Sequence, residues 1–309
     1  MENPYYDLNT YFKNSFGHRV HKIAIDAGMS CPNRDGHLST SGCVYCNQTG
    51  SGTGFFQKGL SVTDQNAKAY IRKRFKAQKF IAYFQSFTNT YAPIDRLKRL
   101  YDEALAVEDV VGLSIGTRPD CVDTDILNLL QGYAEKYLIW IEYGLQSAHD
   151  RTLALINRGH DFKAFQSAVE DTQNRGLHIC AHVILGLPGE SRVQMLETAQ
   201  ILSRVGIDGL KLHLLYVIKG TEMEKWYREG TYVCLTLPEY ADIVCEFLAF
   251  MPKNIVIQRL TSDPHPGELV APLWVLQKAE IRSLIRQTFA TRDLHQGKWF
   301  QPVNETFGL

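Results

Sequence analysis

Short apolar runs rich in β-branched and aromatic residues alternate along the chain with longer amphipathic segments. Six runs predict strands, at residues 21–27, 80–85, 110–116, 137–146, 177–186 and 207–216. The segments between them predict helices, at 93–106, 123–136, 161–176 and 191–206. Three of these helices open on Asp or Ser and two close on Gly, which are residues preferred at helix ends. The pattern is therefore a repeated unit of strand followed by helix.

Nearly continuous apolar strands indicate an α/β protein with a parallel sheet covered by helices. Six repeats favour a partial (β/α)6 TIM-like barrel over a complete barrel of about eight strands, and a doubly wound sheet is the alternative. After residue 236, helical patterns at 237–251 and 273–289 flank a strand-like stretch at 254–260. We therefore expect an amino-terminal segment (1–20), a barrel (21–235) and a small carboxyl-terminal α/β extension (236–309).

Charge and apolar content narrow the protein class. The 309 residues carry 33 Lys plus Arg and 33 Asp plus Glu, so overall charge gives no sign of a nucleic-acid partner. A basic stretch at 67–80 has an ordinary explanation as the solvated face of a helix. The amino terminus does not resemble a signal peptide, and no apolar run reaches the roughly 18 residues that span a bilayer. We expect a cytoplasmic protein with no membrane partner.

The stretch SCPNRDGHLSTSGCVYCNQ, residues 30–48, concentrates three of the seven cysteines. Cys31, Cys43 and Cys46 have the spacing C-x11-C-x2-C, which suits one metal or one cluster better than a disulfide in a reducing compartment. A structural zinc completed by His37 is one alternative. The position after the first predicted strand favours a functional group, and a four-iron cluster on three thiolates leaves one iron open to a chelating ligand. The remaining cysteines are expected to be apolar fillers.

Polar residues gather where the predicted strands end, and binding groups collect at that edge of parallel sheets. The candidates at or after strand ends are Thr88, Asn89, Thr117, Arg118, Gln146, Arg158, Gly186 and Gly189. Glu142, His182, Lys211 and His213 lie on the apolar strands themselves. A buried polar group is costly unless it has a partner, so these four side chains should point into the barrel lumen.

Several motifs together resemble the radical S-adenosylmethionine (radical SAM) superfamily. They are the strand and three-cysteine loop with an aromatic residue before the last cysteine, followed by the β/α repeats. The strings CPNRDG-x6-C-x2-C, YFQ-x2-T-x-T, GTRPDCV, E-x-GLQSAHD-x-TL-x2-INRGHDF, GLPGE and GLKLH look like the small bacterial branch related to the catalytic subunit of Elongator. The likeness runs from about residue 17 to 275. Most of the superfamily spaces its first two cysteines by three residues rather than eleven, and Elongator's acetyltransferase domain has no counterpart here, so no acetyl transfer is expected.

The resemblance implies a 4Fe-4S cluster on Cys31, Cys43 and Cys46, with SAM on the open iron. Reductive cleavage of SAM would give methionine and a 5′-deoxyadenosyl radical. Contacts to SAM are implied for Thr88, Asn89, Thr117, Glu142, Gln146, Arg158, His182, Gly186 and Gly189, with Arg158 as the better carboxylate ligand. Each has a structural alternative: Gln146 could cap a helix, Arg158 could join a surface ion pair, and GLPGE could be only a turn.

The same resemblance implies transfer RNA as the substrate, and a flavodoxin or a ferredoxin-type protein as the electron donor. The hypothesis is radical removal of the carboxymethyl group from 5-carboxymethylaminomethyluridine at the wobble position. Arg118, Lys211 and Arg259 are candidates for the substrate carboxylate, and His213 for the substrate pocket. Lys68 to Lys79 could contact phosphates, and Phe55, Phe56 or Tyr91 could stack on a base. The alternatives are a radical SAM oxidoreductase or lyase acting on a small metabolite or porphyrin-like molecule, and a non-catalytic zinc-containing RNA-binding module.

Overall fold

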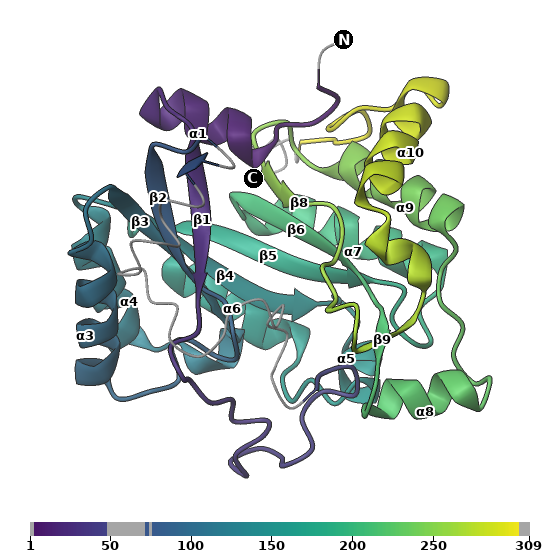
Figure 1. The fold of residues 1–309 in the computed structure, drawn as a ribbon, viewed down its shortest axis with the longest axis horizontal. Coiled ribbons are helices and arrows are strands. Elements are labelled where there is room, and N and C mark those ends of the chain that lie inside the picture. Colours follow the sequence, from purple (N-terminus) through teal and green to yellow (C-terminus); the bar gives the residue numbers. More distant parts are fainter. Residues whose placement is uncertain (1–2, 48–71, 74–75, 303–309) are drawn as a thin grey trace, which may run out of the picture.

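A seven-stranded parallel sheet, curled into a half-barrel, forms the centre of the molecule (Figure 1). The structure is a computed structural model that describes residues 3–47, 72–73 and 76–302. The strands are β1 (Val20–Ile25), β2 (Lys79–Phe84), β3 (Val110–Thr117), β4 (Leu138–Gln146), β5 (His178–Leu185), β6 (Gly209–Leu214) and β8 (Val256–Arg259). They are adjacent in chain order, without the reversal that marks a doubly wound sheet. The predicted partial barrel is confirmed.

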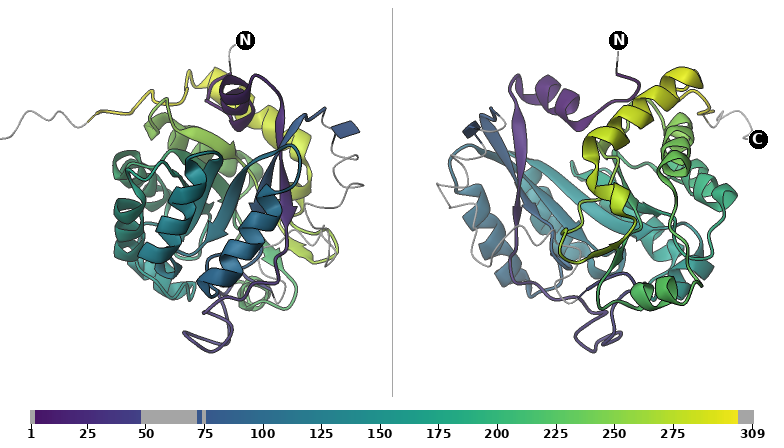
Figure 2. Two further views of the ribbon diagram at one scale, coloured as in Figure 1. Left: turned by 90° about the vertical axis from the view of Figure 1, so that its left-hand side faces the viewer. Right: turned by 45° about the vertical axis from the view of Figure 1, so that its right-hand side comes forward.

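Helices lie along one face of the sheet (Figures 1 and 2). They are α3 (Ile94–Leu105), α4 (Thr124–Ala134), α6 (Phe162–Thr172) and α7 (Arg192–Val205), with α9 (Leu237–Phe250) beside α7. Asp123 caps α4, Asp161 caps α6 and Ser191 caps α7, as the sequence predicts. Short elements η1 (Pro119–Cys121) and α5 (Asp150–Leu155) follow β3 and β4.

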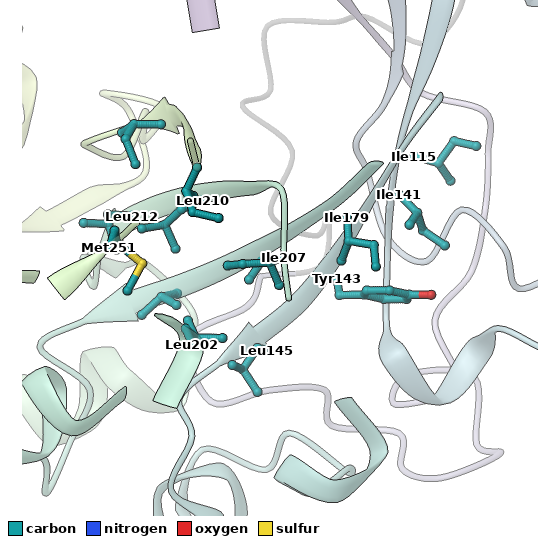
Figure 3. Close-up of a cluster of buried hydrophobic side chains, with 14 of the residues drawn as sticks. Ile115, Ile141, Tyr143, Leu145, Ile179, Leu202, Ile207, Leu210, Leu212 and Met251 are labelled. Carbon is teal, nitrogen blue, oxygen red and sulfur yellow. The ribbon is translucent and has the colours of Figure 1, made fainter. Parts of the chain in front are cut away.

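Side chains alternate along each strand between the hydrophobic core and the lumen of the half-barrel. Ile115, Ile141 and Ile179 stand in register on three adjacent strands and belong to the main hydrophobic core (Figure 3). Successive side chains of a strand point to opposite faces. The polar side chain of Glu142, next to Ile141, therefore points to the other face of the sheet, into the lumen.

The amino-terminal segment connects the two edge strands of the half-barrel. Helix α1 (Leu8–Phe16) lies across the end of the sheet where the strands begin (Figures 1 and 2). Asp7 caps this helix and also forms a parallel bridge with Ile257 of β8. Phe12 packs with Val20 of β1 and Ile81 of β2. The segment thus reaches from β1 to β8 and covers this end of the lumen.

The carboxyl-terminal region extends the sheet as well as packing on it. The expected strand at 254–260 is β8, which pairs in parallel with β6 and makes seven strands where the sequence analysis expected six in the barrel. The remaining elements are β7 (Val217–Ile218), α8 (Glu222–Arg228), β9 (Leu269–Ala271), η2 (Leu273–Leu276) and α10 (Lys278–Thr291). The single helix expected at 273–289 is wrong: it is divided at Gln277, whose ψ of 60° is not helical. The domain division at residue 235 stays a prediction.

No helix in the described part of the chain is long and apolar enough to cross a membrane. The expected cytoplasmic location stays a prediction. Half of the basic stretch at 67–80, together with Phe55 and Phe56, lies outside the described residues. Within the described part, Arg72 and Lys79 both form ion pairs with Asp109.

Candidate active site

One cavity lies at the carboxyl ends of the strands and brings together residues from the whole length of the half-barrel. All three clustered cysteines line it. The predicted site residues on its wall are Cys31, Cys43, Cys46, Thr88, Thr117, Arg118, Glu142, Gln146, Arg158, His182, His213 and Arg259. Four others, Asn89, Gly186, Gly189 and Lys211, do not line it. The convergence follows from the parallel sheet, which places all strand ends on one rim.

The cysteine loop is held by local turns and by two distant segments. The backbone N–H groups of Arg34 and Asp35 donate to the carbonyl of Cys31, and that of Cys46 donates to the carbonyl of Cys43 at 2.9 Å. Val44, between the last two cysteines, donates to Ile156 after α5 and accepts from Met223 of α8, both at 3.1 Å. The loop therefore passes beside α5 and α8 at the end of the sheet (Figure 1).

The Cys43 thiol is buried, and those of Cys31 and Cys46 belong to partly buried residues. Asn33 Nδ2 and Arg158 Nη1 lie 3.6 and 3.7 Å from Cys43 Sγ. Burial, followed by the nearby Cys43, raises the pKa of the Cys46 thiol to about 11. A metal that binds this thiol must displace its proton. The two N–H donors beside Cys43 would stabilise the sulfur once it is a thiolate.

The arrangement does not suit a single closed metal ion. In residues 3–47, 72–73 and 76–302, no three His, Cys, Asp or Glu side chains group closely enough to hold one ion. His37, the proposed fourth zinc ligand, is exposed, and its ring centroid lies 6.4 Å from that of Tyr91. Three thiols spread around one cavity fit a cluster, in which each thiolate binds a different iron. Asn33 Oδ1, which is buried and has no hydrogen-bond partner among the described residues, is a further polar atom beside these thiols.

Arg158 and Gln146 are packed around Gly144 at the end of β4. Arg158 donates to the Gly144 carbonyl from Nη2 at 2.7 Å and from Nε at 3.2 Å. A Cβ on Gly144 would lie 2.7 Å from Arg158 Nη2 and 2.8 Å from Gln146 Nε2, so only glycine fits without moving them. Arg158 is 7% exposed, which rules out the surface ion pair considered from the sequence. Gln146 caps no helix, because the N-cap of α5 is His149.

The loops after β2 and β3 are tied to each other. Asn89 Nδ2 donates to the carbonyl of Gly116 at 2.9 Å, and the Thr90 and Thr117 hydroxyls lie 2.5 Å apart. Arg118, only 2% exposed, binds both carboxylate oxygens of Asp120 at 2.9 and 2.7 Å. Its Nη1 donates to the carbonyl of Arg158 at 2.8 Å. Arg118 therefore positions the backbone of Arg158, and each of its three guanidinium nitrogens already donates a hydrogen bond.

The GLPGE turn packs against the carboxyl-terminal half of the molecule. Gly186 and Gly189 have φ values of 83° and 77°, a conformation that favours glycine. Tyr232 donates from its hydroxyl to the Gly186 carbonyl at 2.8 Å, and Leu235 covers the position of a Cβ. The implied contact of these glycines with a bound adenine stays a prediction.

Glu142 is the centre of a buried network in the lumen. Its carboxylate accepts from Lys22 Nζ at 2.7 Å, from His182 Nε2 at 2.8 Å, and from Lys211 Nζ. Ser114 also donates to it. The four donors come from β1, β3, β5 and β6, so the network crosses most of the half-barrel. The predicted inward orientation of Glu142, His182 and Lys211 agrees with these contacts.

Burial and the two lysines control protonation in this network. Burial alone would raise the pKa of Glu142, but Lys211 and Lys22 hold it well below its usual value. Burial lowers the pKa of Lys22 to about 8, with Glu142 opposing the shift. Burial, followed by Lys211, lowers the pKa of His182 to about 4, so this imidazole is neutral at neutral pH.

The sequence analysis did not single out Lys22 or Tyr83. Tyr83 lines the cavity, accepts from Lys211 Nζ at 3.0 Å, and has that nitrogen 4.1 Å from its ring centroid. Lys22 is a lysine inside an apolar strand, the same signal that pointed to Lys211. That signal was available for Lys22, whereas a tyrosine in an apolar strand is too common to indicate a site.

His213 and Arg259 form a second polar group on the lumen wall. The imidazole of His213 lies 5.3 Å from that of His182, measured between ring centroids. Arg259 Nη1 lies 2.9 Å from Asp263 Oδ2, and the Arg259 side chain is 27% exposed. Both residues line the cavity.

The sequence matches two family models. One is described as the radical SAM superfamily and matches residues 35–226. The other is described as the radical SAM C-terminal domain and matches residues 207–291. The first model covers more than half of the chain and includes Cys43, Cys46 and the GLPGE turn.

Relatives of similar length include YtqA of Bacillus subtilis, 39% identical over all of this chain and 96% of that protein. MJ0486 of Methanocaldococcus jannaschii is 39% identical over 94% of this chain and 90% of that protein. More distant is a protein named tRNA uridine(34) acetyltransferase of Dehalococcoides mccartyi, 29% identical over 59% of this chain and 39% of its own length. The chain thus spans well under half of that enzyme.

Among solved structures, the archaeal Elp3 of Methanocaldococcus infernus superposes with a TM-score of 0.66 at 18% identity, covering 90% of this chain and 64% of that chain. Methylornithine synthase (PylB) gives a TM-score of 0.53 at 13% identity, over 92% of this chain and 86% of that chain. Because the sequence identities are this low, the superpositions show only that the fold is shared.

Proposed function

The chain belongs to the radical SAM superfamily, and we propose that it modifies the 5-substituent of a wobble uridine in transfer RNA. The proposed reaction converts 5-carboxymethylaminomethyluridine to 5-aminomethyluridine. One observation supports assigning radical SAM chemistry to particular residues. Cys31, Cys43 and Cys46 line the same cavity as Arg158 and Gln146. The substrate assignment is supported by the relationship to a protein named for tRNA uridine(34).

The chain's own residues fit the cofactors that the superfamily uses. Cys31, Cys43 and Cys46 would hold a 4Fe-4S cluster, and Asn33 would stabilise the Cys43 thiolate through its N–H donor. Arg158 and Gln146, packed beside Gly144, would bind the polar groups of SAM. When bound, the cluster supplies the electron that cleaves SAM to methionine and a 5′-deoxyadenosyl radical. The protein binds, orients and excludes water.

The lumen suits a substrate group with hydrogen-bonding and negative character. Glu142, His182, His213 and Arg259 line its wall, and all four are held by strands. Their rigid placement would orient the uridine side chain toward the cluster end of the cavity. Tyr91, which is partly buried beside the cysteine loop, remains the described candidate for stacking on a base.

The proposed reaction is a two-electron oxidation with hydrolysis. A hydrogen atom is removed from the methylene between the amine and the carboxylate, and one further electron passes to an iron–sulfur acceptor. The resulting carbon–nitrogen double bond adds water and breaks. The products are the primary amine on the uridine and glyoxylate. A low-potential donor, flavodoxin or a ferredoxin-type protein, would supply the electron consumed in SAM cleavage.

The test is anaerobic reconstitution with SAM, reductant and tRNA that carries 5-carboxymethylaminomethyluridine. We expect 5-aminomethyluridine, glyoxylate and 5′-deoxyadenosine in comparable amounts. Binding of the tRNA should also weaken as salt rises, because phosphate contacts release counterions. Formation of 5′-deoxyadenosine without change in the nucleoside would contradict the proposed substrate while leaving the radical SAM assignment intact.

A matched pair of cysteine variants tests the cluster assignment. Cys43→Ala should lose iron and all 5′-deoxyadenosine formation. Cys245→Ala should retain both, because Cys245 is buried in the hydrophobic core, where its thiol contacts the Ile285 carbonyl. Equal iron content in the two variants would contradict the assignment.

A further inference from the structure

Register across the last three strands places basic residues in two layers of the lumen. His182 of β5 pairs with Lys211 of β6, and Lys211 pairs with Arg259 of β8. His213 lies two residues after Lys211, on the same face of β6 and one layer nearer to the carboxyl ends of the strands. The cysteine loop lies at those ends. His213 therefore stands between the Glu142 network and the cluster end of the cavity, while Arg259 lies in the layer of Lys211, on the neighbouring strand.

Two of the three cations considered for a substrate carboxylate are already engaged. Lys211 donates to Glu142 and to Tyr83, and it does not line the cavity. Arg118 binds Asp120 through two nitrogens and the Arg158 carbonyl through the third. To reach a substrate, either residue would have to break buried contacts, which costs free energy. Arg259 remains.

Arg259 carries positive charge that its partner only partly neutralises. Asp263 forms an ion pair with Arg259 at 2.9 Å and another with Lys278 at 2.9 Å. One carboxylate is thus shared by two cations, so this part of the wall has an excess of positive charge. A guanidinium presents five N–H donors in a planar fork that matches a carboxylate. The ion pair to Asp263 uses Nη1.

His213 has a buried nitrogen that nothing in the described chain satisfies. Its Nε2 atom is inaccessible to solvent and has no hydrogen-bond partner among the described residues. Burial, followed by His182 and Arg259, lowers the pKa of His213 well below its usual value, so the ring is neutral. A neutral imidazole can donate one N–H. A buried polar atom without a partner is destabilising, which points to a ligand that supplies an acceptor.

We propose that His213 and Arg259 form a carboxylate subsite that selects an N-alkylglycine group in the substrate. The inference rests on the proposed function, and it identifies the part of the uridine side chain that this wall recognises. Arg259 binds the carboxylate oxygens, and His213 donates its Nε2–H to one of them. The methylene that loses hydrogen is attached directly to that carboxylate, so the subsite also positions the reacting carbon.

The first experiment compares two tRNA substrates. One carries 5-carboxymethylaminomethyluridine, and in the other the carboxylate has been coupled to methylamine and is neutral. The wild type should prefer the carboxylate. Arg259→Met and His213→Leu should each raise KM for the carboxylate substrate by about 10- to 100-fold, the range for hydrogen bonds to charged groups. They should leave KM for the amide nearly unchanged.

Conservative variants and a neighbour serve as controls. Arg259→Lys keeps the charge and should retain part of the preference, and His213→Gln keeps an N–H donor and should do the same. Lys278 forms the other ion pair with Asp263 and does not itself line the cavity, so Lys278→Met should still prefer the carboxylate substrate. Circular dichroism and iron content establish that each variant folds. Unchanged preference for the carboxylate in both Arg259→Met and His213→Leu would overturn the subsite.

A second readout separates this inference from the proposed function. Isothermal titration of N-benzylglycine and its neutral amide into the reconstituted enzyme measures recognition without tRNA. We expect the wild type to bind the acid, and Arg259→Met to lose that binding. If the wild type modifies no tRNA but shows this pattern, the tRNA function fails and the subsite stands. If the acid and the amide bind alike, the subsite is wrong whatever the tRNA result.

Discussion

At the scale of single residues, the active-site cavity depends on groups that other side chains hold in place. Gly144 allows Arg158 and Gln146 to approach the end of β4, and Arg118 holds the backbone of Arg158 through Nη1 at 2.8 Å. The side chains of Arg118, Gln146 and Arg158 are all buried. Function at this site is therefore sensitive to small changes of volume.

Gly144→Ala should impair SAM cleavage more than folding. The new Cβ would lie 2.7 Å from Arg158 Nη2 and would displace that side chain. A misplacement of this kind can lower the rate about 100-fold, which 5′-deoxyadenosine formation would measure. Gly132→Ala is the matched control, because Gly132 lies on α4 with nothing within 4 Å of its Cβ position. Equal activity of the two variants would contradict this account of Gly144.

His182 should make the stability of the protein depend on pH. Burial lowers its pKa in the fold to about 4 from the usual 6.5, so between these values the unfolded chain binds a proton that the folded chain does not. The free energy of unfolding should therefore fall as the pH drops from about 6.5 to about 4. Urea titrations at a series of pH values should show that the free energy of unfolding changes more steeply with pH in the wild type than in His182→Asn over this window. Parallel curves would be inconsistent with a buried neutral imidazole.

At the scale of elements, helix ends on the outer face are specified locally. Ser191 and Gln194 form a capping box at the start of α7, in which each side chain satisfies a backbone N–H of the other residue. Thr236 and Glu239 do the same at α9. These helices lie side by side, so their starts are set by local sequence before they pack.

Ser191→Ala should lower the free energy of unfolding by about 1 kcal/mol through loss of the cap. Chemical denaturation measures the change. Ser203→Ala is the matched control on the same helix, because Ser203 only bonds the carbonyl of Gln200 one turn before it. We expect that control to change stability by less than about 0.5 kcal/mol. If Ser203→Ala lowered the free energy of unfolding by as much as Ser191→Ala, the result would argue against a specific capping effect.

At the scale of the whole molecule, the open half-barrel is closed at one end by contacts between the two edge strands. Lys22 of β1 donates to Gln258 of β8 at 2.6 Å, across 236 positions of sequence. The bridge from Asp7 to Ile257 and the packing of α1 lie beyond it. The other end of the lumen holds the cysteine loop. The molecule therefore presents its cavity in one direction.

Phe12→Ala should weaken this closure. Phe12 is 2% exposed and packs on β1 and β2, and removal of a buried phenyl ring typically costs about 3–5 kcal/mol. Hydrogen exchange should become faster in β1 and β8 than in β4, which lies at the centre of the sheet. Lys13→Ala, exposed on the same helix, is the control and should change neither property. Uniform acceleration across the sheet would contradict a local closure.

Local pattern was sufficient for the repeated strand–helix unit, the helix caps and the cluster of cysteines. It also located Glu142, His182, Lys211 and His213, because a polar residue on an apolar strand must find a partner. Only the tertiary structure decided which partners they have, that β8 completes the sheet, and that Arg118 and Lys211 are engaged while Arg259 faces the cavity. Those outcomes depend on contacts between residues far apart in sequence. The periodicity of apolar residues and the spacing of motifs do not specify such contacts.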